Sequence, residues 1–360
     1  MLNDVCLSQL ESMSNRSRRN FLRDIAYLSG GLLVAASTAE NEKGPRWRAE
    51  ISMRGSRRPS VSLQAATTAH IDDLLVHLRD QWHVLVGTDN LLGPRHALPG
   101  VLDQLGVIDD LLTSATSSVD VRHRVVKLAA QYAESASWLF EDSGDLDEAV
   151  QWNNRAMEWA VEADDLPMLS WTLFRRSQQA IPTGNPAKVL SLAQTAGRPG
   201  DRLLPSMRAA IAQQEAHGHA LNGDEISTMH RLDDAHLLAV TQADIEARSG
   251  HGAFCTPSYI ELQRARCWLV LGRPERAVEV YRATIPQLPA VSLRDRGLAL
   301  AGLASAYVAI DEPQEAGSVA VDALHIGQST GSDRIVQEVY AVGGRAPAVG
   351  QLIDQLIDKP

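Results

Sequence analysis

The chain has 360 residues, of which 44% are hydrophobic and 22% are charged. That composition is typical of a soluble globular protein and excludes a disordered chain, a collagen and a polytopic membrane protein. Three cysteines are too few for a disulfide scaffold or for a zinc site with four cysteine ligands. Aromatic residues make up only 5%, which disfavours a fold rich in strands.

Charge is distributed unevenly along the chain. Residues 1–60 hold ten Lys and Arg against six Asp and Glu, a net charge of +4. Since the whole chain carries −10, residues 61–360 carry −14. An acidic body of this kind disfavours non-specific nucleic-acid binding, which needs cations to neutralise phosphates.

The first recognisable motif is a twin arginine followed by a modest apolar run. The phrase S-R-R-x-F-L resembles a twin-arginine export signal. The apolar run, residues 25–36, is too short to span a bilayer as a helix. Two interpretations stay open for residues 17–39: an export or membrane-contacting signal, and an internal amphipathic linker. The residues that carry the motif are Arg18, Arg19, Phe21 and Leu22.

Residues 40–65 are rich in arginine, glycine, proline and serine, and neither a helical nor a strand period persists in them. Such a composition is typical of a flexible linker. We therefore expect residues 1–65 to form a disordered, basic N-terminal segment and residues 66–360 to form a separate helical domain.

From about residue 68 the apolar residues recur at three- and four-residue steps, as on one face of a helix. The first such pattern covers residues 70–86 and the second covers residues 101–112. Between these two patterns, Gly93-Pro94 and Pro99-Gly100 are predicted to interrupt the helix. No segment alternates with a two-residue period, so almost no strand is expected.

Comparison of the chain with itself reveals a repeat. Five turn residues are separated by 40, 39, 49 and 39 positions: Gly144, Gly184, Gly223, Gly272 and Asp311. Seven positions before each of these anchors lies a small residue: Ser137, Ser177, Ala216, Ala265 and Ala304. Twelve positions after each anchor lies another: Ala156, Ala196, Ala235, Thr284 and Ala323.

This spacing has a physical reason. Two helices cross closely only where both carry small side chains, and the turn between them needs a residue that tolerates a left-handed backbone. Each helix pair leaves an apolar face open, which the next pair covers. The repeat therefore predicts an all-α fold, an α-hairpin solenoid.

The repeats resemble the tetratricopeptide repeat (TPR), a helix-turn-helix unit of about 34 residues. The resemblance rests on G-D-x-x-x-A at Gly144 and G-R-P-E-R-A at Gly272, each preceded by a helix with a small residue seven positions back. It covers about residues 120–330 and implies degenerate TPR-like helix pairs. A generic α-hairpin solenoid is the alternative, with the same architecture.

A second resemblance covers more of the chain. The RRxFL segment, the basic linker, the phrase NLLGPRHALPGVL and the degenerate repeats resemble the TPR-containing regulators common in actinobacteria. Those regulators usually carry a helix-turn-helix domain before the RRxFL segment. Here 17 residues precede Arg18, too few for such a domain, so direct DNA binding is not expected. In that family the RRxFL segment can lie inside a cytoplasmic chain, which favours a cytoplasmic location.

Common catalytic motifs are missing from the sequence. It has no phosphate-binding loop, no G-x-G-x-x-G, no G-x-S-x-G, no H-E-x-x-H and no C-x-x-C. His217 and His219 lie two residues apart on a predicted helix and point to different sides, so they are poor metal ligands. Cys267 is expected to be a buried small hydrophobe. We expect no enzyme activity, no cofactor and no metal site.

The TPR resemblance implies a concave groove lined by residues thirteen, ten, six and three positions before each anchor. These positions hold aromatic, amide and charged side chains, as interaction hot spots do. The alternative is that the aromatic residues merely pack neighbouring helices. We expect a non-enzymatic regulator, acting in transcriptional or developmental control, that binds a protein or peptide through Trp138, Trp171, Phe174, Gln178, Gln213, Tyr259 and Arg266. The alternative is an exported or membrane-tethered binding protein that uses residues 17–39.

Overall fold

The computed structural model describes residues 68–114, 119–241, 251–252 and 254–357. The predicted N-terminal segment 1–65, with its twin-arginine motif at Arg18, Arg19, Phe21 and Leu22, lies outside the described residues. Within them, all secondary structure is α- or 3-10 helix, which confirms the prediction of an all-α fold. None of the described helices is long and apolar enough to cross a membrane.

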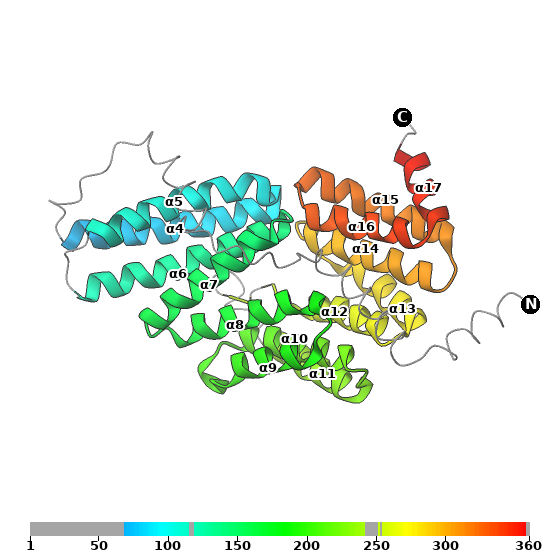
Figure 1. The fold of residues 1–360 in the computed structure, drawn as a ribbon, viewed down its shortest axis with the longest axis horizontal. Helices are drawn as coiled ribbons and strands as arrows, with labels where there is room; N and C mark the ends of the chain where they lie inside the picture. The colour runs from blue at the N-terminus through cyan, green and yellow to red at the C-terminus, as the bar shows by residue number, and fades with distance from the viewer. Residues whose placement is uncertain (1–67, 115–118, 242–250, 253, 358–360) are drawn as a thin grey trace, which may run out of the picture.

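The described residues form fourteen α-helices that pack in chain order. Their bounds are α4 Thr68–Leu92, α5 Pro94–Ser114, α6 Val119–Asp142, α7 Leu146–Glu162, α8 Leu166–Ala180, α9 Pro186–Gly197, α10 Pro205–Leu221, α11 Glu225–Thr241, α12 Pro257–Val270, α13 Pro274–Thr284, α14 Leu293–Ala309, α15 Pro313–Thr330, α16 Asp333–Arg345 and α17 Pro347–Ile357. Each helix contacts the next, and the most extensive contacts join α6 to α7, α10 to α11 and α14 to α15. This is the predicted solenoid of helix pairs (Figure 1).

All five predicted anchors lie in the turns between paired helices. Each has a positive φ, from 61° to 79°, which is the left-handed conformation that the turn requires. Asp311 adopts it without being glycine, at 62°. The turn positions read from the sequence are therefore confirmed.

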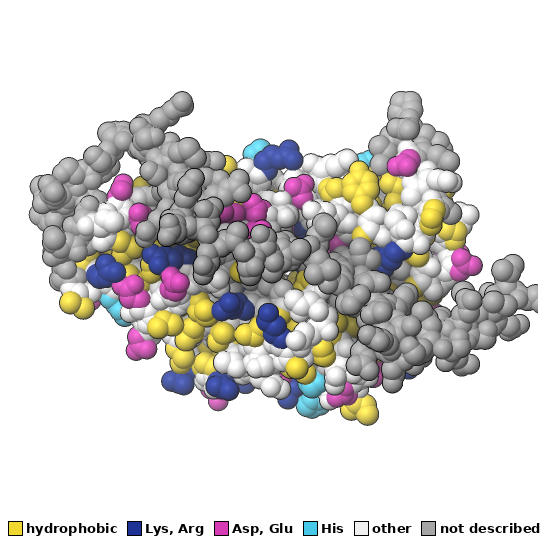
Figure 2. All heavy atoms as spheres, viewed as in Figure 1, with side chains coloured by type: hydrophobic (Ala, Val, Ile, Leu, Met, Phe, Trp, Pro, Cys, Tyr) yellow, Lys and Arg dark blue, Asp and Glu magenta, His cyan; other side chains and the backbone are white. Residues whose placement is uncertain are grey.

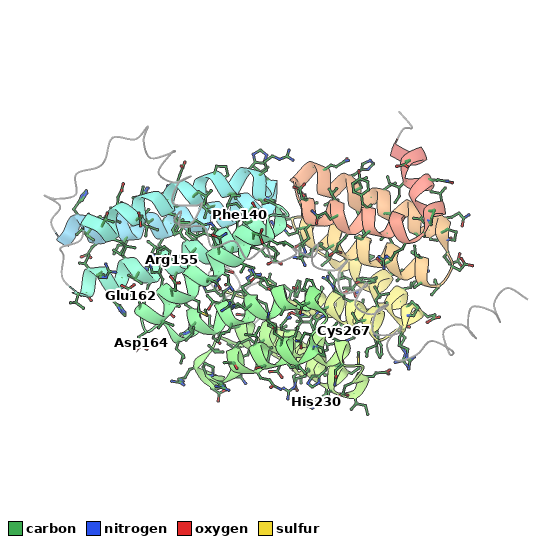
Figure 3. All side chains as sticks on the ribbon, viewed as in Figure 1. Phe140, Arg155, Glu162, Asp164, His230 and Cys267 are labelled. Carbon is green, nitrogen blue, oxygen red and sulfur yellow. The ribbon has the colours of Figure 1, made fainter. Side chains whose placement is uncertain are left out.

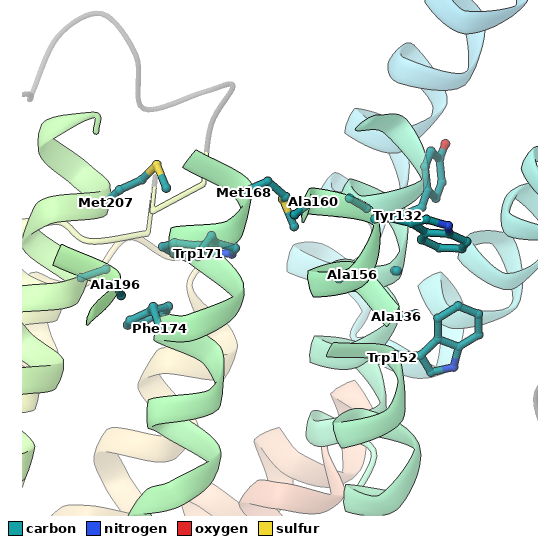
Figure 4. Packing of buried hydrophobic residues seen from close by; sticks show 14 of the residues in the cluster. Tyr132, Ala136, Trp152, Ala156, Ala160, Met168, Trp171, Phe174, Ala196 and Met207 are labelled. Atoms are coloured by element: carbon teal, nitrogen blue, oxygen red, sulfur yellow. The ribbon is translucent and has the colours of Figure 1, made fainter. Parts of the chain in front are cut away.

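The small residues of the repeat lie at the helix crossings. Ser137, Ser177, Ala216, Ala265 and Ala304 are at most 1% exposed, and the five small residues after the anchors are buried as well. Figure 4 shows Ala156 and Ala160 in this packing layer. The two serines satisfy their hydroxyl groups across the pair: Ser137 Oγ donates to the carbonyl of Ala149 at 2.7 Å, and Ser177 Oγ donates to that of Val189 at 2.8 Å. The position seven residues before each anchor can therefore hold either Ser or Ala.

The break between the first two helices is shorter than predicted. The chain turns only at Gly93, where φ is 83°, and α5 begins at Pro94. Pro99-Gly100 does not interrupt the helix, so the prediction of a second break at this position is wrong. Pro99 lies within the first two turns of α5, where it removes one backbone hydrogen bond and the helix continues.

The 49-residue spacing between the third and fourth anchors has a visible cause. The connection from α11 to α12 spans residues 242–256, whereas α7 and α8 are joined by residues 163–165 alone. The described end of the long connection, from His251 onward, lies against α8 and α10: the Ser206 hydroxyl donates to the carbonyl of His251 at 3.2 Å. This described end of the connection therefore lies on the concave side of the array.

The two ends of the array meet. Helices α14 and α15 contact α4, and α16 contacts α6, so the ends face each other in Figure 1. The contact is polar. Arg294 donates to Asp142 at 2.8 Å and also to Asp89, and Ser332 donates to the other oxygen of Asp142 at 2.8 Å. The solenoid is consequently closed into a ring around a central space.

Candidate functional site

The central space is a partly open cavity of about 1430 Å³. Helices from α4 to α16 contribute to its wall, so it belongs to the whole array and not to one repeat. Six of the seven predicted groove residues line it: Trp138, Trp171, Gln178, Gln213, Tyr259 and Arg266.

The seventh residue, Phe174, does not line the cavity. Its side chain is fully buried in the hydrophobic core and stacks on Trp171 with ring centroids 4.5 Å apart. Figure 4 shows the two rings side by side, with Met207 and Met168 in the same layer. Phe174 therefore packs neighbouring helices, which is the alternative that the sequence left open for the aromatic residues. Trp171, Arg175 and Gln178 lie on the face of α8 toward the cavity, whereas Phe174 lies on the part of α8 that packs into the core.

Trp171 is held in place by a buried ion pair. Its indole Nε1 donates to Glu134 Oε1 at 2.9 Å, and Arg175 Nε donates to the same oxygen at 2.7 Å. Burial alone would raise the pKa of Glu134, but the Arg175 charge and the donated hydrogen bonds outweigh it and keep that pKa below its ordinary value. Arg175 also donates to Gln178 Oε1 at 3.0 Å. The wall at this point is rigid, charged and internally paired.

The described end of the α11–α12 connection, from His251 onward, lies on this wall. The His251 imidazole stacks on Trp171 at 5.3 Å, and its Nδ1 lies 3.9 Å from Glu134 Oε2. Burial lowers the pKa of His251 and favours the neutral ring. Phe254 packs edge-on against Tyr259 at 4.9 Å. The sequence interpretation missed His251; the long spacing after Gly223 was the one pattern that pointed to this segment.

Three guanidinium groups surround Trp138. The ring centroid lies 4.6 Å from Arg175 Cζ, 5.0 Å from Arg294 Cζ and 5.9 Å from Arg334 Cζ. These distances are typical of cation–π contacts. Arg294 and Arg334 come from α14 and α16, at the far end of the chain. Their place in the site depends on ring closure, which no local pattern reveals.

Asp295 follows Arg294 in the first turn of α14 and also lines the cavity. Among the described residues it forms neither a hydrogen bond nor an ion pair, unlike Glu134, Asp89 and Asp142. Burial raises the pKa of Asp295 to about 6, although the charges of Arg294 and Arg334 oppose this shift. It is the carboxylate of the cavity whose negative charge is least compensated.

Amide groups form another part of the cavity wall, which we call the amide wall. Five glutamines from α8, α10 and α12 line the cavity: Gln178, Gln179, Gln213, Gln214 and Gln263. Gln213 and Gln214 are each 1% exposed, and in the described structure Gln213 Oε1 and Gln214 Nε2 have no hydrogen-bond partner. Arg266 faces Glu338 at 3.5 Å. This wall therefore holds two buried amide groups with an unsatisfied atom each, whereas its arginine already has an acidic neighbour.

Cys267 contacts His217, which lines the cavity beside these glutamines. Cys267 Sγ lies 3.8 Å from His217 Nδ1, and His217 Nε2 lies 3.0 Å from Gln263 Oε1. Burial raises the pKa of the Cys267 thiol to about 12 and lowers that of His217 to about 4. A nucleophilic pair requires the opposite order, a thiolate beside an imidazolium. Both groups are thus neutral and buried, and Figure 3 shows Cys267 within α12.

The described residues contain no group of three or more His, Cys, Asp or Glu side chains arranged to hold a metal ion. On the face shown in Figure 2, basic and acidic side chains are interspersed among the described residues and form no large patch of one sign. The cavity is therefore the most structured candidate site in the described part of the chain. No protein-family model and no curated protein matches this chain.

Proposed function

We propose that this protein is a non-enzymatic regulator of the TPR type, which binds a peptide or an extended segment of a partner protein in its central cavity. The observation that carries the proposal is the cavity itself: about 1430 Å³, with six residues chosen from the sequence register on its wall. A typical small-molecule pocket measures about 300–1000 Å³, so this one suits a larger ligand.

The amide wall favours a peptide over other ligands of that size. A glutamine side chain presents one acceptor and one donor group, which is the same pair that each peptide unit presents. Gln213 and Gln214 bury such groups without a partner, at a cost in folding free energy of about 1–3 kcal/mol for each group. If the two amide groups rotate toward the cavity, a bound main chain that satisfies them would recover that cost.

Binding to blocked peptide pools tests this function. Wild-type protein is incubated with N-acetylated, C-amidated pentapeptides of mixed sequence, and the complexes are counted by native mass spectrometry. We expect the wild type to retain peptides. Gln213→Leu and Gln214→Leu should each bind at least about tenfold less peptide, because each removes one neutral hydrogen-bonding side chain from the wall.

Gln151→Leu is the matched control, because Gln151 is exposed on α7, outside the cavity. It should bind as the wild type does. Equal retention by all four proteins would remove the cavity from the proposal, and no retention by any of them would argue against peptide binding altogether.

We propose a cytoplasmic location, with action through a partner, on the resemblance to regulators whose RRxFL segment lies inside the chain. The competing proposal is an exported or membrane-tethered binding protein that uses residues 17–39 as a twin-arginine signal. Cell fractionation followed by N-terminal sequencing separates the two. A mature chain that begins at Glu40 outside the cytoplasm would support export and contradict the cytoplasmic proposal.

A further inference from the structure

An arginine on a cavity wall is a ready partner for a carboxylate of a ligand, but the arginines of this cavity already have acidic partners within the protein. Arg266 faces Glu338 at 3.5 Å, Arg175 is bonded to Glu134, and Arg294 is bonded to Asp142 and Asp89. An anionic ligand would have to displace a protein carboxylate from one of these arginines.

One carboxylate at the cavity wall has no arginine partner within 4.0 Å. Five guanidinium groups line the cavity: Arg175, Arg266, Arg294, Arg334 and Arg345. Six carboxylates either line it or bond to an arginine that does: Asp89, Glu134, Glu141, Asp142, Asp295 and Glu338. Five of the six are within 4.0 Å of an arginine nitrogen, and Asp295 is the exception among them.

We propose that the ligand of this cavity carries an ammonium or guanidinium group that pairs with Asp295 beside the ring of Tyr259. This inference rests on the proposed peptide-binding function and names the chemical class of the ligand, a peptide with a basic side chain. Lysine and arginine side chains supply the missing cation, and the amide wall of Gln213 and Gln214 takes the main chain.

The surroundings of Asp295 suit a cation. Tyr259 lines the cavity near it: burial, together with the neighbouring Cys255 and Asp295, raises the pKa of the Tyr259 hydroxyl, so that side chain stays neutral. A cation that sits against Asp295 would therefore meet a carboxylate and an aromatic side chain in a partly enclosed space, where both attractions are stronger than in water. Burial raises the pKa of Asp295 in the ligand-free protein, and a bound cation would reverse that shift.

The test uses four pools of N-acetylated, C-amidated pentapeptides, whose central residue is fixed as Lys, Arg, Gln or Glu and whose other positions are uncharged. We expect the wild type to retain the Lys and Arg pools at least about tenfold better than the Gln pool, because a charge-assisted hydrogen bond is worth that much in affinity. Asp295→Asn should abolish the preference. Asp322→Asn, a change at an exposed position of α15, should keep it.

Equal retention of the Lys, Arg and Gln pools, or the best retention of the Glu pool, would overturn the inference. So would an undiminished preference for Lys and Arg in Asp295→Asn, because the cation would then sit elsewhere.

A second measurement separates this inference from the proposed function. The full-length protein, labelled with ¹³C at the Asp side-chain carboxyl groups, is titrated by NMR with Nα-acetyl-lysine amide and, as control, Nα-acetyl-glutamine amide. The Asp295 signal is assigned by its loss in Asp295→Asn. We expect the lysine amide alone to lower the pKa of Asp295. If no peptide pool binds but the lysine amide lowers that pKa, peptide binding fails and the cation site stands; if the lysine amide has no effect, the cation site is refuted.

Discussion

The interfaces within the helix pairs and the wall of the cavity are built from opposite kinds of residue. Within the pairs, small side chains such as Ala265 and Ala304 are fully buried at positions that recur along the chain. On the cavity wall, charged side chains are compensated by partners far away in the sequence, as when Arg294 bonds Asp142 and Asp89. The pairs are stabilised locally, whereas the cavity depends on the closure of the ring.

The largest expected effect comes from breaking that closure. Arg294→Ala leaves Asp142 and Asp89 buried without their cation, and removal of one partner of a buried ion pair costs about 3–5 kcal/mol. Urea unfolding measures the loss. Arg282→Ala, at an exposed position of α13, should change stability by less than about 0.5 kcal/mol. Small-angle scattering should show a larger radius of gyration for Arg294→Ala alone; an unchanged radius would mean that the ends stay together without this bond.

The next effect tests the interfaces within the pairs. Ala304 is fully buried where α14 crosses α15, so Ala304→Leu should overpack the crossing and cost about 1–3 kcal/mol. Ala309→Leu makes the same chemical change at an exposed position of the same helix and should be close to neutral. Equal melting temperatures for the two variants would contradict the repeat register.

This contrast also explains how much the sequence could predict. The turn anchors, the small residues and the all-α fold follow from local rules of helix pairing, and the structure has them where the spacing places them. Pro99 misled the prediction because α5 continues through it, despite the backbone hydrogen bond that an interior proline removes.

The site was predictable only in part. The register indicated Trp138, Trp171, Gln213 and others, because a solenoid directs equivalent positions to its concave side. The register did not predict Arg294, Arg334 or Asp295. These residues join the site through ring closure, which depends on the summed curvature of all the repeats. The register did not predict His251 either, because this residue comes from an insertion that has no counterpart in the other repeats.

A smaller effect on stability is expected from replacing a turn glycine, compared with a glycine inside a helix. Gly272 has φ of 71° and no heavy atom within 4 Å of an added Cβ, so Gly272→Ala should cost about 1 kcal/mol through backbone strain alone. Gly87 lies inside α4 with the same free space, and Gly87→Ala should stabilise by about 0.5–1 kcal/mol. Thermal unfolding followed by circular dichroism compares the two. Shifts of the same sign would mean that Gly272 does not need its left-handed backbone.

The smallest effect concerns the charge of the cavity wall. Because burial raises the pKa of Asp295 from 3.8 to about 6, the folded state binds this proton more tightly than the unfolded state does. Ionised Asp295 therefore costs stability above pH 6, and the cost shrinks as the pH falls from 6 towards 4. Asp295→Asn should be more stable than the wild type at pH 7.5, by about 1 kcal/mol or less given its partial exposure, and nearly equal to it at pH 4.5.

His217 contributes the opposite dependence, because burial lowers its pKa to about 4 and protonation of the unfolded chain below pH 6.5 reduces stability. The comparison must for this reason be made between Asp295→Asn and the wild type at each pH, since His217 is common to both and its effect cancels in the difference. Asp322→Asn should show no difference at either pH. If Asp295→Asn is instead less stable than the wild type at pH 7.5, the carboxylate supports the fold, and its charge is compensated within the ring without any ligand.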